Sequence, residues 1–382
     1  MRNFREKSRL VAGVMKMPAR WVGLALLVWG LGCTQGPKRI VGPTFYPALP
    51  EAPRLQYLTT INNEQDIGAK TSAFKDFVVG QTRAPLSLGR PWDVAHEKGK
   101  LFVVDRGLGG VVILDLVNKR FDFFEEGPEG ALEEPFGIFV SADGLKYVAD
   151  KGRGQVVVFD QQNRFHRTYG TEGQYAPLDV VVRGDRLYVC DVRDNEVEIL
   201  DVASGEVVGK IGKTPKGREE GSLYWPTHLA VDDAGALYVT DLLNFRVQIF
   251  DSNDVFLRSV GELGDFPGAM PRPKGTAVDR QGHLFVVDSS FEMVQIFEAS
   301  TGEVLMPFGK FAPAPGGGSQ GLAPGASWLP TGIHIDYDNL EYFRQYVDAS
   351  FRPEYLVYVT NQAGGSRLNV YAFGERIGAP ER

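Results

Sequence analysis

The chain repeats one pattern of apolar and polar positions six times between residues 91 and 373. In each repeat a proline precedes an apolar run that ends in a polar residue, and a second apolar run ends ten or eleven residues later. The prolines are spaced by 42 to 57 residues and are Pro91, Pro135, Pro177, Pro226, Pro273 and Pro330. The residues that end the first runs are Asp105, Asp150, Asp191, Asp241, Asp288 and Asn361.

Each of the first five repeats predicts four short strands. In the fourth repeat these are residues 226–231, 236–240, 246–251 and 255–260. The second and third runs are almost wholly apolar, which indicates strands buried on both faces. Several strands in a unit of roughly 40–50 residues are typical of a β-propeller. The sequence therefore predicts an all-β fold, a six-bladed β-propeller of four-stranded antiparallel blades.

The sixth repeat stops after its third strand, at residues 368–373. Residues 57–61 have the pattern of an outermost strand, so we expect the N-terminal strand to complete the last blade and remove two open sheet edges. The propeller then spans residues 54–374, with a C-terminal tail at 375–382. Residues 69–90 are expected to be a surface excursion in which 74–79 add a short strand.

The run WPTHLAVDDAGALYVTDLLNFRVQIFD at residues 225–251 closely resembles the NHL-repeat family of six-bladed propellers, including Asn244 and Arg246. The resemblance covers about residues 54–374. It implies the fold but not one activity, because the family includes protein-binding modules, lyases and hydrolases. The chain departs from the family pattern at residues 336–354, an insertion between the first two strands of the last repeat. Residues 339–347 of this insertion predict a short helix.

The N-terminus resembles a bacterial lipoprotein signal. Basic residues precede an apolar stretch at 21–31, which is shorter than the roughly 20 residues that span a bilayer. Residues 1–32 are therefore predicted to be a signal peptide that begins at Met1, Met15 or Met17, and Cys33 to be lipidated. Residues 33–53 are proline-rich and predict an extended tether. The resemblance implies an outer-membrane lipoprotein facing the periplasm or the cell surface; plain secretion is the alternative.

Charge and cysteine content narrow the class of partner. The full chain has a net charge of −7, and removal of residues 1–32 leaves 35 basic and 47 acidic residues. This balance argues against nucleic acid as a partner and favours a soluble, monomeric propeller. The second of the two cysteines, Cys190, lies in an apolar run and is expected to be buried, so no disulfide is predicted.

The position two residues after each proline holds the chain's best candidates for metal ligands. Its occupants are Asp93, Gly137, Asp179, His228, Gly275 and Gly332. Asp93, Asp179 and His228 could bind a divalent metal at the channel mouth; alternatively, the aspartates bind local backbone N–H groups. His96 and His283 are placed at turns, and His334 beside the channel. The acids that end the second strands are expected to anchor loops.

A second set of residues predicts a binding face. Tryptophans flank the inner-strand prolines, and arginines follow the second strands on the same face; such residues favour protein recognition. The predicted binding face consists of Trp92, Asp93, Arg106, Arg153, Asp179, Arg193, Trp225, His228 and Trp328. Alternatively, the tryptophans are core residues between blades.

The sequence therefore favours a non-catalytic platform that binds an envelope protein or peptide and is held at a membrane by its lipid. No cofactor is required for this role. A metal-dependent lyase or hydrolase with its site at the channel mouth is the alternative.

Overall fold

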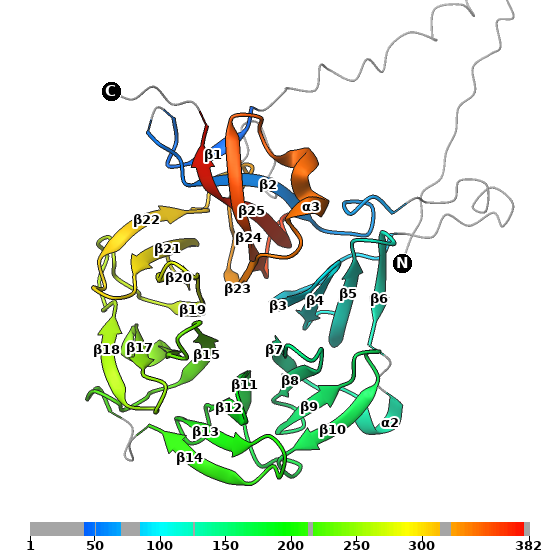
Figure 1. Ribbon diagram of the computed structural model, residues 1–382, viewed down its shortest axis with the longest axis vertical. Helices are drawn as coiled ribbons and strands as arrows, with labels where there is room; N and C mark the ends of the chain where they lie inside the picture. The colour runs from blue at the N-terminus through cyan, green and yellow to red at the C-terminus, as the bar shows by residue number, and fades with distance from the viewer. Residues whose placement is uncertain are drawn as a thin grey trace, which may run out of the picture. The chain divides into compact units, whose positions relative to one another are not determined.

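The computed structural model describes residues 42–49, 51–69, 85–124, 127–212, 217–313 and 322–377. Within the unit that begins at Pro43, six antiparallel sheets surround a central axis (Figure 1). The predicted six-bladed β-propeller is thus confirmed. The predicted signal peptide, Cys33, most of the tether and the strand expected at 74–79 lie outside the described residues.

Blades one to three each begin at a predicted proline, and the second strand of each ends at the predicted acid. Blade one comprises β3 (Pro91–Glu97), β4 (Lys100–Asp105), β5 (Gly110–Asp115) and β6 (Arg120–Phe123). Blade two comprises β7 (Pro135–Val140), β8 (Lys146–Asp150), β9 (Gln155–Phe159) and β10 (Phe165–Tyr169). Blade three comprises β11 (Pro177–Arg183), β12 (Arg186–Asp191), β13 (Glu196–Asp201) and β14 (Val207–Ile211).

Blades four and five have the same four-stranded plan. Blade four comprises β15 (Pro226–Val231), β16 (Leu237–Asp241), β17 (Arg246–Phe250) and β18 (Phe256–Val260). Blade five comprises β19 (Pro273–Val278), β20 (His283–Asp288), β21 (Met293–Glu298) and β22 (Val304–Phe308). A 3-10 turn, η1 (Leu242–Asn244), joins β16 to β17.

The last blade contains strands from both ends of the propeller, as predicted. Its strand order is β1 (Thr44–Tyr46), β2 (Leu55–Ile61), β25 (Leu368–Arg376), β24 (Phe351–Asn361) and β23 (Pro330–Asp336). β2 pairs antiparallel with β25 and closes the ring. The fifth strand, β1, lies within the segment interpreted as a tether, and it pairs with β2 from Thr44 to Tyr46.

Neighbouring blades share their apolar cores, which explains the continuous apolar runs. Phe102 and Val104 of blade one are buried in the same cluster as Val148 and Val157 of blade two. Strands buried on both faces have no polar side, so each blade is stabilised by apolar packing against the blades on either side.

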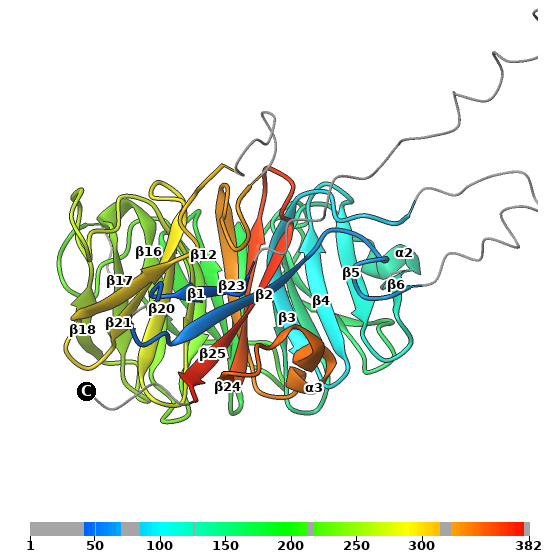
Figure 2. The same ribbon diagram turned by 90° about the horizontal axis from the view of Figure 1, so that it is seen from above.

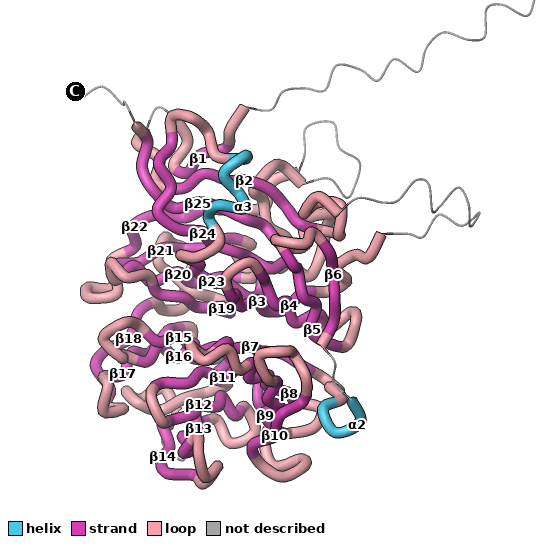
Figure 3. Tube along the Cα trace, turned by 45° about the vertical axis from the view of Figure 1, so that its right-hand side comes forward, coloured by secondary structure: helices cyan, strands magenta, loops and turns pink. Residues whose placement is uncertain are grey.

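Helices are short and few among the described residues (Figure 3). Besides η1, they are α2 (Gly127–Gly130), α3 (Leu340–Phe343) and the 3-10 turn η2 (Arg344–Tyr346). The last two lie in the blade-six insertion, as expected, and Phe343 is buried against blades one and six. Figure 2 shows α3 at one end of the blade-six strands. No described helix has the length and hydropathy needed to cross a membrane.

The first strand of each blade, called the inner strand, begins at the end of the propeller where the second strand finishes. Pro91 is opposite Asp105 in the first blade, and Pro330 is opposite Asn361 in the last. We call this end the top face and the opposite end the bottom face. The blade-six insertion joins the first and second strands of its blade and so belongs to the bottom face, as predicted.

The acids that end the second strands anchor loops on the top face, which confirms their predicted structural role. The carboxylate of Asp105 accepts hydrogen bonds from the backbone N–H groups of Gly89, at 2.6 Å, and Arg90, at 2.8 Å. Asp150 accepts two equivalent bonds, and Asn361 accepts one from Trp328 at 3.2 Å. Each such residue ties its blade to the loop that leads into it.

Candidate functional site

The inner strands approach one another closely just below the top face. An ideal Cβ atom added to Gly137 would lie 2.3 Å from Oδ1 of Asp179, and one added to Gly332 would lie 2.7 Å from Oδ1 of Asp93. A side chain at either position would therefore collide with the neighbouring blade. This accounts for glycine at 137 and 332; a Cβ on Gly275 would likewise lie 2.6 Å from the backbone oxygen of Thr331.

Asp93 and Asp179 hold the neighbouring inner strands. A bulge follows the proline in each of these strands and frees a backbone N–H from the ladder. Oδ2 of Asp93 accepts the N–H of Ile138 at 3.0 Å, and Oδ2 of Asp179 accepts that of Leu229 at 2.7 Å. These donors belong to the next blade, so the contacts differ from the local ones that were the alternative to metal binding; Asp179 also accepts the adjacent Val180 N–H at 2.8 Å.

Burial makes both of these carboxyl groups hard to ionise. Burial raises the pKa of Asp93 to about 7, although its hydrogen bond from the backbone N–H of Ile138 acts in the opposite direction. Burial and the nearby Asp93 raise the pKa of Asp179 well above its usual range. A carboxylate in an apolar setting loses hydration that backbone donors only partly replace.

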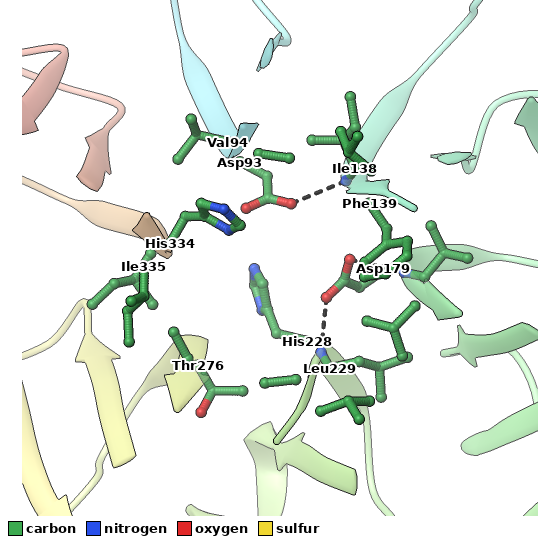
Figure 4. A pocket seen from close by; sticks show the side chains of 18 of the residues that line it. Asp93, Val94, Ile138, Phe139, Asp179, His228, Leu229, Thr276, His334 and Ile335 are labelled. Carbon is green, nitrogen blue, oxygen red and sulfur yellow. Dashed lines mark hydrogen bonds between the residues drawn. The ribbon is translucent and has the colours of Figure 1, made fainter. Parts of the chain in front are cut away.

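His228 is the third polar residue of this ring, and its imidazole has no partner in the described structure. The side chain is 4% exposed, and neither Nδ1 nor Nε2 makes a hydrogen bond to a described residue. Burial, assisted by the charge of Lys274, lowers the pKa of His228 to about 3, so the ring is neutral near pH 7. Figure 4 shows Asp93, Asp179 and His228 directed into the channel.

These side chains line a channel cavity of about 230 Å³. Most of the remaining wall is apolar and includes Ile138, Leu229 and Ile333. His96 and His334 line the bottom end. The cavity thus combines a mostly apolar wall with a few polar groups, which is the usual composition of a small-molecule site.

The predicted metal trio does not form a compact ligand set. In the described part of the chain, the sole group of three potential ligand atoms within 4.8 Å of one another is that of His96, Asp336 and Asp338. His96 lies within β3, not in a turn, because the strand continues to Glu97. Its Nε2 is 3.3 Å from Oδ1 of Asp336 and 3.2 Å from Oδ2 of Asp338.

Asp336 in this second group is already occupied by hydrogen bonds. Its Oδ1 accepts the backbone N–H groups of Asp338, at 2.7 Å, and Asn339, at 3.1 Å. Its Oδ2 accepts the Asn339 amide at 2.7 Å and the hydroxyl of Tyr358 at 2.9 Å. A carboxylate with this many donors serves as a turn anchor and has little capacity left for a metal ion.

An aromatic and cationic cluster occupies the top of the channel. The rings of Trp92 and Phe136 meet edge to face with centroids 4.9 Å apart. The guanidinium of Arg106 lies 4.1 Å from the centre of the Phe136 ring and is hydrogen-bonded to Glu134. The ammonium of Lys274 lies 5.3 Å from the centre of the Trp92 ring.

Lys274 was not predicted from the sequence, although its position directly after Pro273 indicates that it lies at the top of the channel. The residues directly after the inner-strand prolines form a ring above that of Asp93, Asp179 and His228. Its members are Trp92, Phe136, Leu178, Thr227, Lys274 and Thr331. Burial and the charges of Arg272 and Arg106 lower the pKa of Lys274 to about 8. Reading one position earlier in each repeat would have identified it.

Two of the arginines predicted for the binding face are held by backbone carbonyl groups. Nη1 of Arg153 donates to the carbonyls of Glu129, at 2.7 Å, and Ala131, at 3.1 Å. Nη1 of Arg193 donates to the carbonyls of Gly173, at 2.5 Å, and Gln174, at 2.9 Å. Both guanidinium groups therefore stabilise top-face loops.

The three tryptophans of the predicted binding face differ in exposure. Trp225 is 42% exposed, whereas Trp92 and Trp328 are half-buried. Trp328 packs edge to face against Phe311 at 5.7 Å. The backbone N–H of Trp225 donates to Oδ1 of Asn195 at 2.9 Å, which fixes its loop while the side chain stays partly exposed.

Comparison with known proteins supports the fold and shows no family. A scan against models of known protein families finds no match. Protein brain tumor of Drosophila melanogaster is 30% identical over 141 residues, which are 35% of this chain and 13% of that protein. The chain thus spans about an eighth of that relative, and the likeness to an NHL-repeat protein is partial.

Two solved structures show the same general fold at low sequence identity. A protein of unknown function from Bacteroides thetaiotaomicron is 16% identical with a TM-score of 0.55, and the match covers 83% of this chain and 75% of that one. A streptogramin B lyase is 14% identical with a TM-score of 0.52, and the match covers 76% and 96%. These likenesses show a propeller, which is compatible with a binding platform.

Proposed function

We propose that this protein is a non-catalytic binding platform that recognises an envelope protein or peptide through its top face. We further propose that it is exported and anchored to the outer membrane by lipid on Cys33. The propeller supplies a rigid support, and the loops at one end supply recognition.

One observation carries the proposal for the top face. Its loops expose large apolar side chains in addition to the Trp92–Phe136 cluster, namely Leu108, Trp225, Leu263, Phe266, Phe311 and Leu329. Exposed aromatic and aliphatic side chains next to cationic ones are typical of protein-binding surfaces. Arg106 and Lys274 supply the cations, and the closed ring of blades holds their positions.

An enzymatic role has less support in the geometry. Asp93 and Asp179 are engaged by backbone donors, and the predicted metal trio is absent from the compact ligand groups of the described chain. The streptogramin B lyase resembles this chain in fold alone. The platform is therefore the function that the described residues support best.

Crosslinking in intact cells tests the proposed surface. A photoreactive amino acid replaces Trp225 on the top face in one variant and Val117 on the bottom face in the other; both residues are exposed. We expect a discrete crosslinked partner at position 225 and none at position 117. Equal labelling at both positions would contradict recognition by the top face.

Lipid attachment has its own test. Labelled palmitate should enter the wild-type chain and should not enter a Cys33→Ser variant. Incorporation that persists in the variant would contradict the proposed anchor and would leave the top-face proposal unaffected.

A further inference from the structure

The channel wall holds two buried carboxyl groups without a cationic partner in the described structure. Asp93 is 8% exposed and Asp179 is 5% exposed. Backbone N–H groups supply their hydrogen bonds, from Ile138 and Val94 to Asp93 and from Leu229 and Val180 to Asp179. Neither forms an ion pair with a described Lys, Arg or His side chain. Buried carboxylates are ordinarily paired with a cation or hydrogen-bonded throughout, so this arrangement leaves acceptor capacity in the cavity.

His228 adds an unused acceptor to the same cavity. Its ring is nine-tenths buried, is directed into the channel, and has no hydrogen-bond partner on either nitrogen among the described residues (Figure 4). A neutral imidazole offers one lone pair and one N–H group. Buried polar atoms rarely lack a hydrogen-bond partner, which indicates that a bound molecule supplies the partner of His228.

The charges on the other inner strands determine the direction of access. β7 has no charged side chain, and β19 contributes Lys274, whose ammonium lies over the Trp92 ring at the top end. The bottom end carries His96, His334 and Asp336, with the exposed carboxylate of Asp338 beside them; Arg183 and Glu97 at the ends of β11 and β3 are ion-paired with Asp254 and Lys146. A positive top and an acidic bottom favour entry of a cation from the bottom face.

We propose that the central channel binds a small organic ammonium ion, held by the carboxylates of Asp93 and Asp179 and by the imidazole of His228. An ammonium group has three N–H donors, and these three side chains supply three acceptors. Ile138, Leu229 and Ile333 supply an apolar wall for a short alkyl chain. This site is separate from the top-face surface, so a result that rules out ammonium binding would leave the proposed platform unaffected.

The same features disfavour a metal ion as the occupant. The potential ligand atoms of Asp93, Asp179 and His228 do not all lie within 4.8 Å of one another, whereas a metal draws its ligands into one compact shell. An alkylammonium ion tolerates this wider spacing and gains from the apolar wall. Its positive charge also stabilises the ionised forms of Asp93 and Asp179, whose pKa values burial raises, so binding releases protons from this pair to the buffer.

Calorimetric titration of the full chain tests this site. The probes are n-alkylammonium ions from methylammonium to hexylammonium, with 1-butanol as the uncharged probe and MnCl₂ as the metal probe. Titrations at pH 6 in two buffers of different ionisation enthalpy give the number of protons released. We expect at least one alkylammonium ion to bind with proton release, and 1-butanol and Mn²⁺ to bind at least tenfold more weakly.

Matched variants assign the binding to the channel. Asp93→Asn and Asp179→Asn should each weaken alkylammonium binding at least tenfold, and Asp93→Asn should reduce the proton release. Asp233→Asn makes the same change of charge at an exposed position and should leave binding unchanged. Absence of binding by every alkylammonium ion, tighter binding of Mn²⁺, or equal affinity in the channel variants and wild type would overturn the proposal.

Discussion

Nδ1 of His96 lies 2.6 Å from Nε2 of His334, so the inner strands of the first and last blades are joined by a bond between two imidazoles. One ring must donate and the other must accept, which requires the accepting nitrogen to be unprotonated. Burial and the neighbouring His96 lower the pKa of His334 well below its usual range. The closure of the ring therefore includes a contact that acid should weaken.

The first prediction concerns the acid sensitivity of this contact. His334 is harder to protonate in the folded protein than in the unfolded chain, so its contribution to stability is present above pH 6.5 and is lost as the pH falls below it. His334→Gln should reduce the drop in unfolding free energy between pH 7.5 and 5 by about 1–2 kcal/mol. Urea unfolding at both pH values measures this. His166→Gln, at an exposed site, should leave the drop unchanged; an unchanged drop in His334→Gln would contradict the account.

The second prediction concerns Asp93 and has the opposite sign. Its pKa of about 7 is higher than in the unfolded chain, so its contribution is full below about pH 4 and is lost as the pH rises through 7. Asn at this position can still accept the Ile138 N–H. Asp93→Asn should therefore gain stability relative to wild type by about 1–4 kcal/mol between pH 4.5 and 8. Thermal melts across this range should show a stability gain relative to wild type that increases with pH in Asp93→Asn and is absent in the exposed control Asp233→Asn.

The third prediction tests the loop anchors. The buried carboxylate of Asp241 accepts hydrogen bonds from the Tyr224 backbone N–H and from Asn244, Arg246 and Gln248. Asp241→Ala should cost about 3 kcal/mol or more, because it leaves these donors and the Arg246 charge unpaired. Asp251→Ala removes a less buried turn anchor and should cost about 1 kcal/mol. Equal losses in equilibrium unfolding would contradict the special role of the second-strand acids.

The fourth prediction concerns ring closure by β2. Leu55 is fully buried between this strand and the blade-five and blade-six cores. Leu55→Ala should reduce the unfolding free energy by about 2–5 kcal/mol. Leu49→Ala, at a residue that is 47% exposed, should change it by less than about 0.5 kcal/mol. A Leu55→Ala protein as stable as wild type would show that β2 does not secure the last blade.

The blades could be predicted from the sequence because their signals are local and repeated. A proline, an apolar run and an acid at fixed spacing specify strand order, buried faces and loop anchors within each repeat. Strand β1 could not be predicted, because three residues among prolines show no periodicity. Its pairing with β2 supplies the partners that the local sequence does not.

The candidate site could be predicted only in part, because it depends on contacts between blades. The sequence placed Asp93, Asp179 and His228 at the same depth of the channel, but it could not show that backbone donors of the next blade engage both aspartates. It also could not show that Arg153 and Arg193 turn toward carbonyl groups of neighbouring loops. The contact between His96 and His334 joins residues 238 positions apart, so no short sequence motif predicts it.

Recognition by the top face can be measured most directly by peptide selection on the purified full chain. A random peptide library is panned on wild type, and the affinities of the selected peptides are compared among Trp225→Ala, Leu329→Ala and the bottom-face variant Val117→Ala. The account predicts at least a tenfold loss of affinity in the first two variants, no change in the third, and unaltered melting temperatures in all three. Selected peptides that bind Trp225→Ala and Leu329→Ala as tightly as wild type would contradict the proposed platform surface.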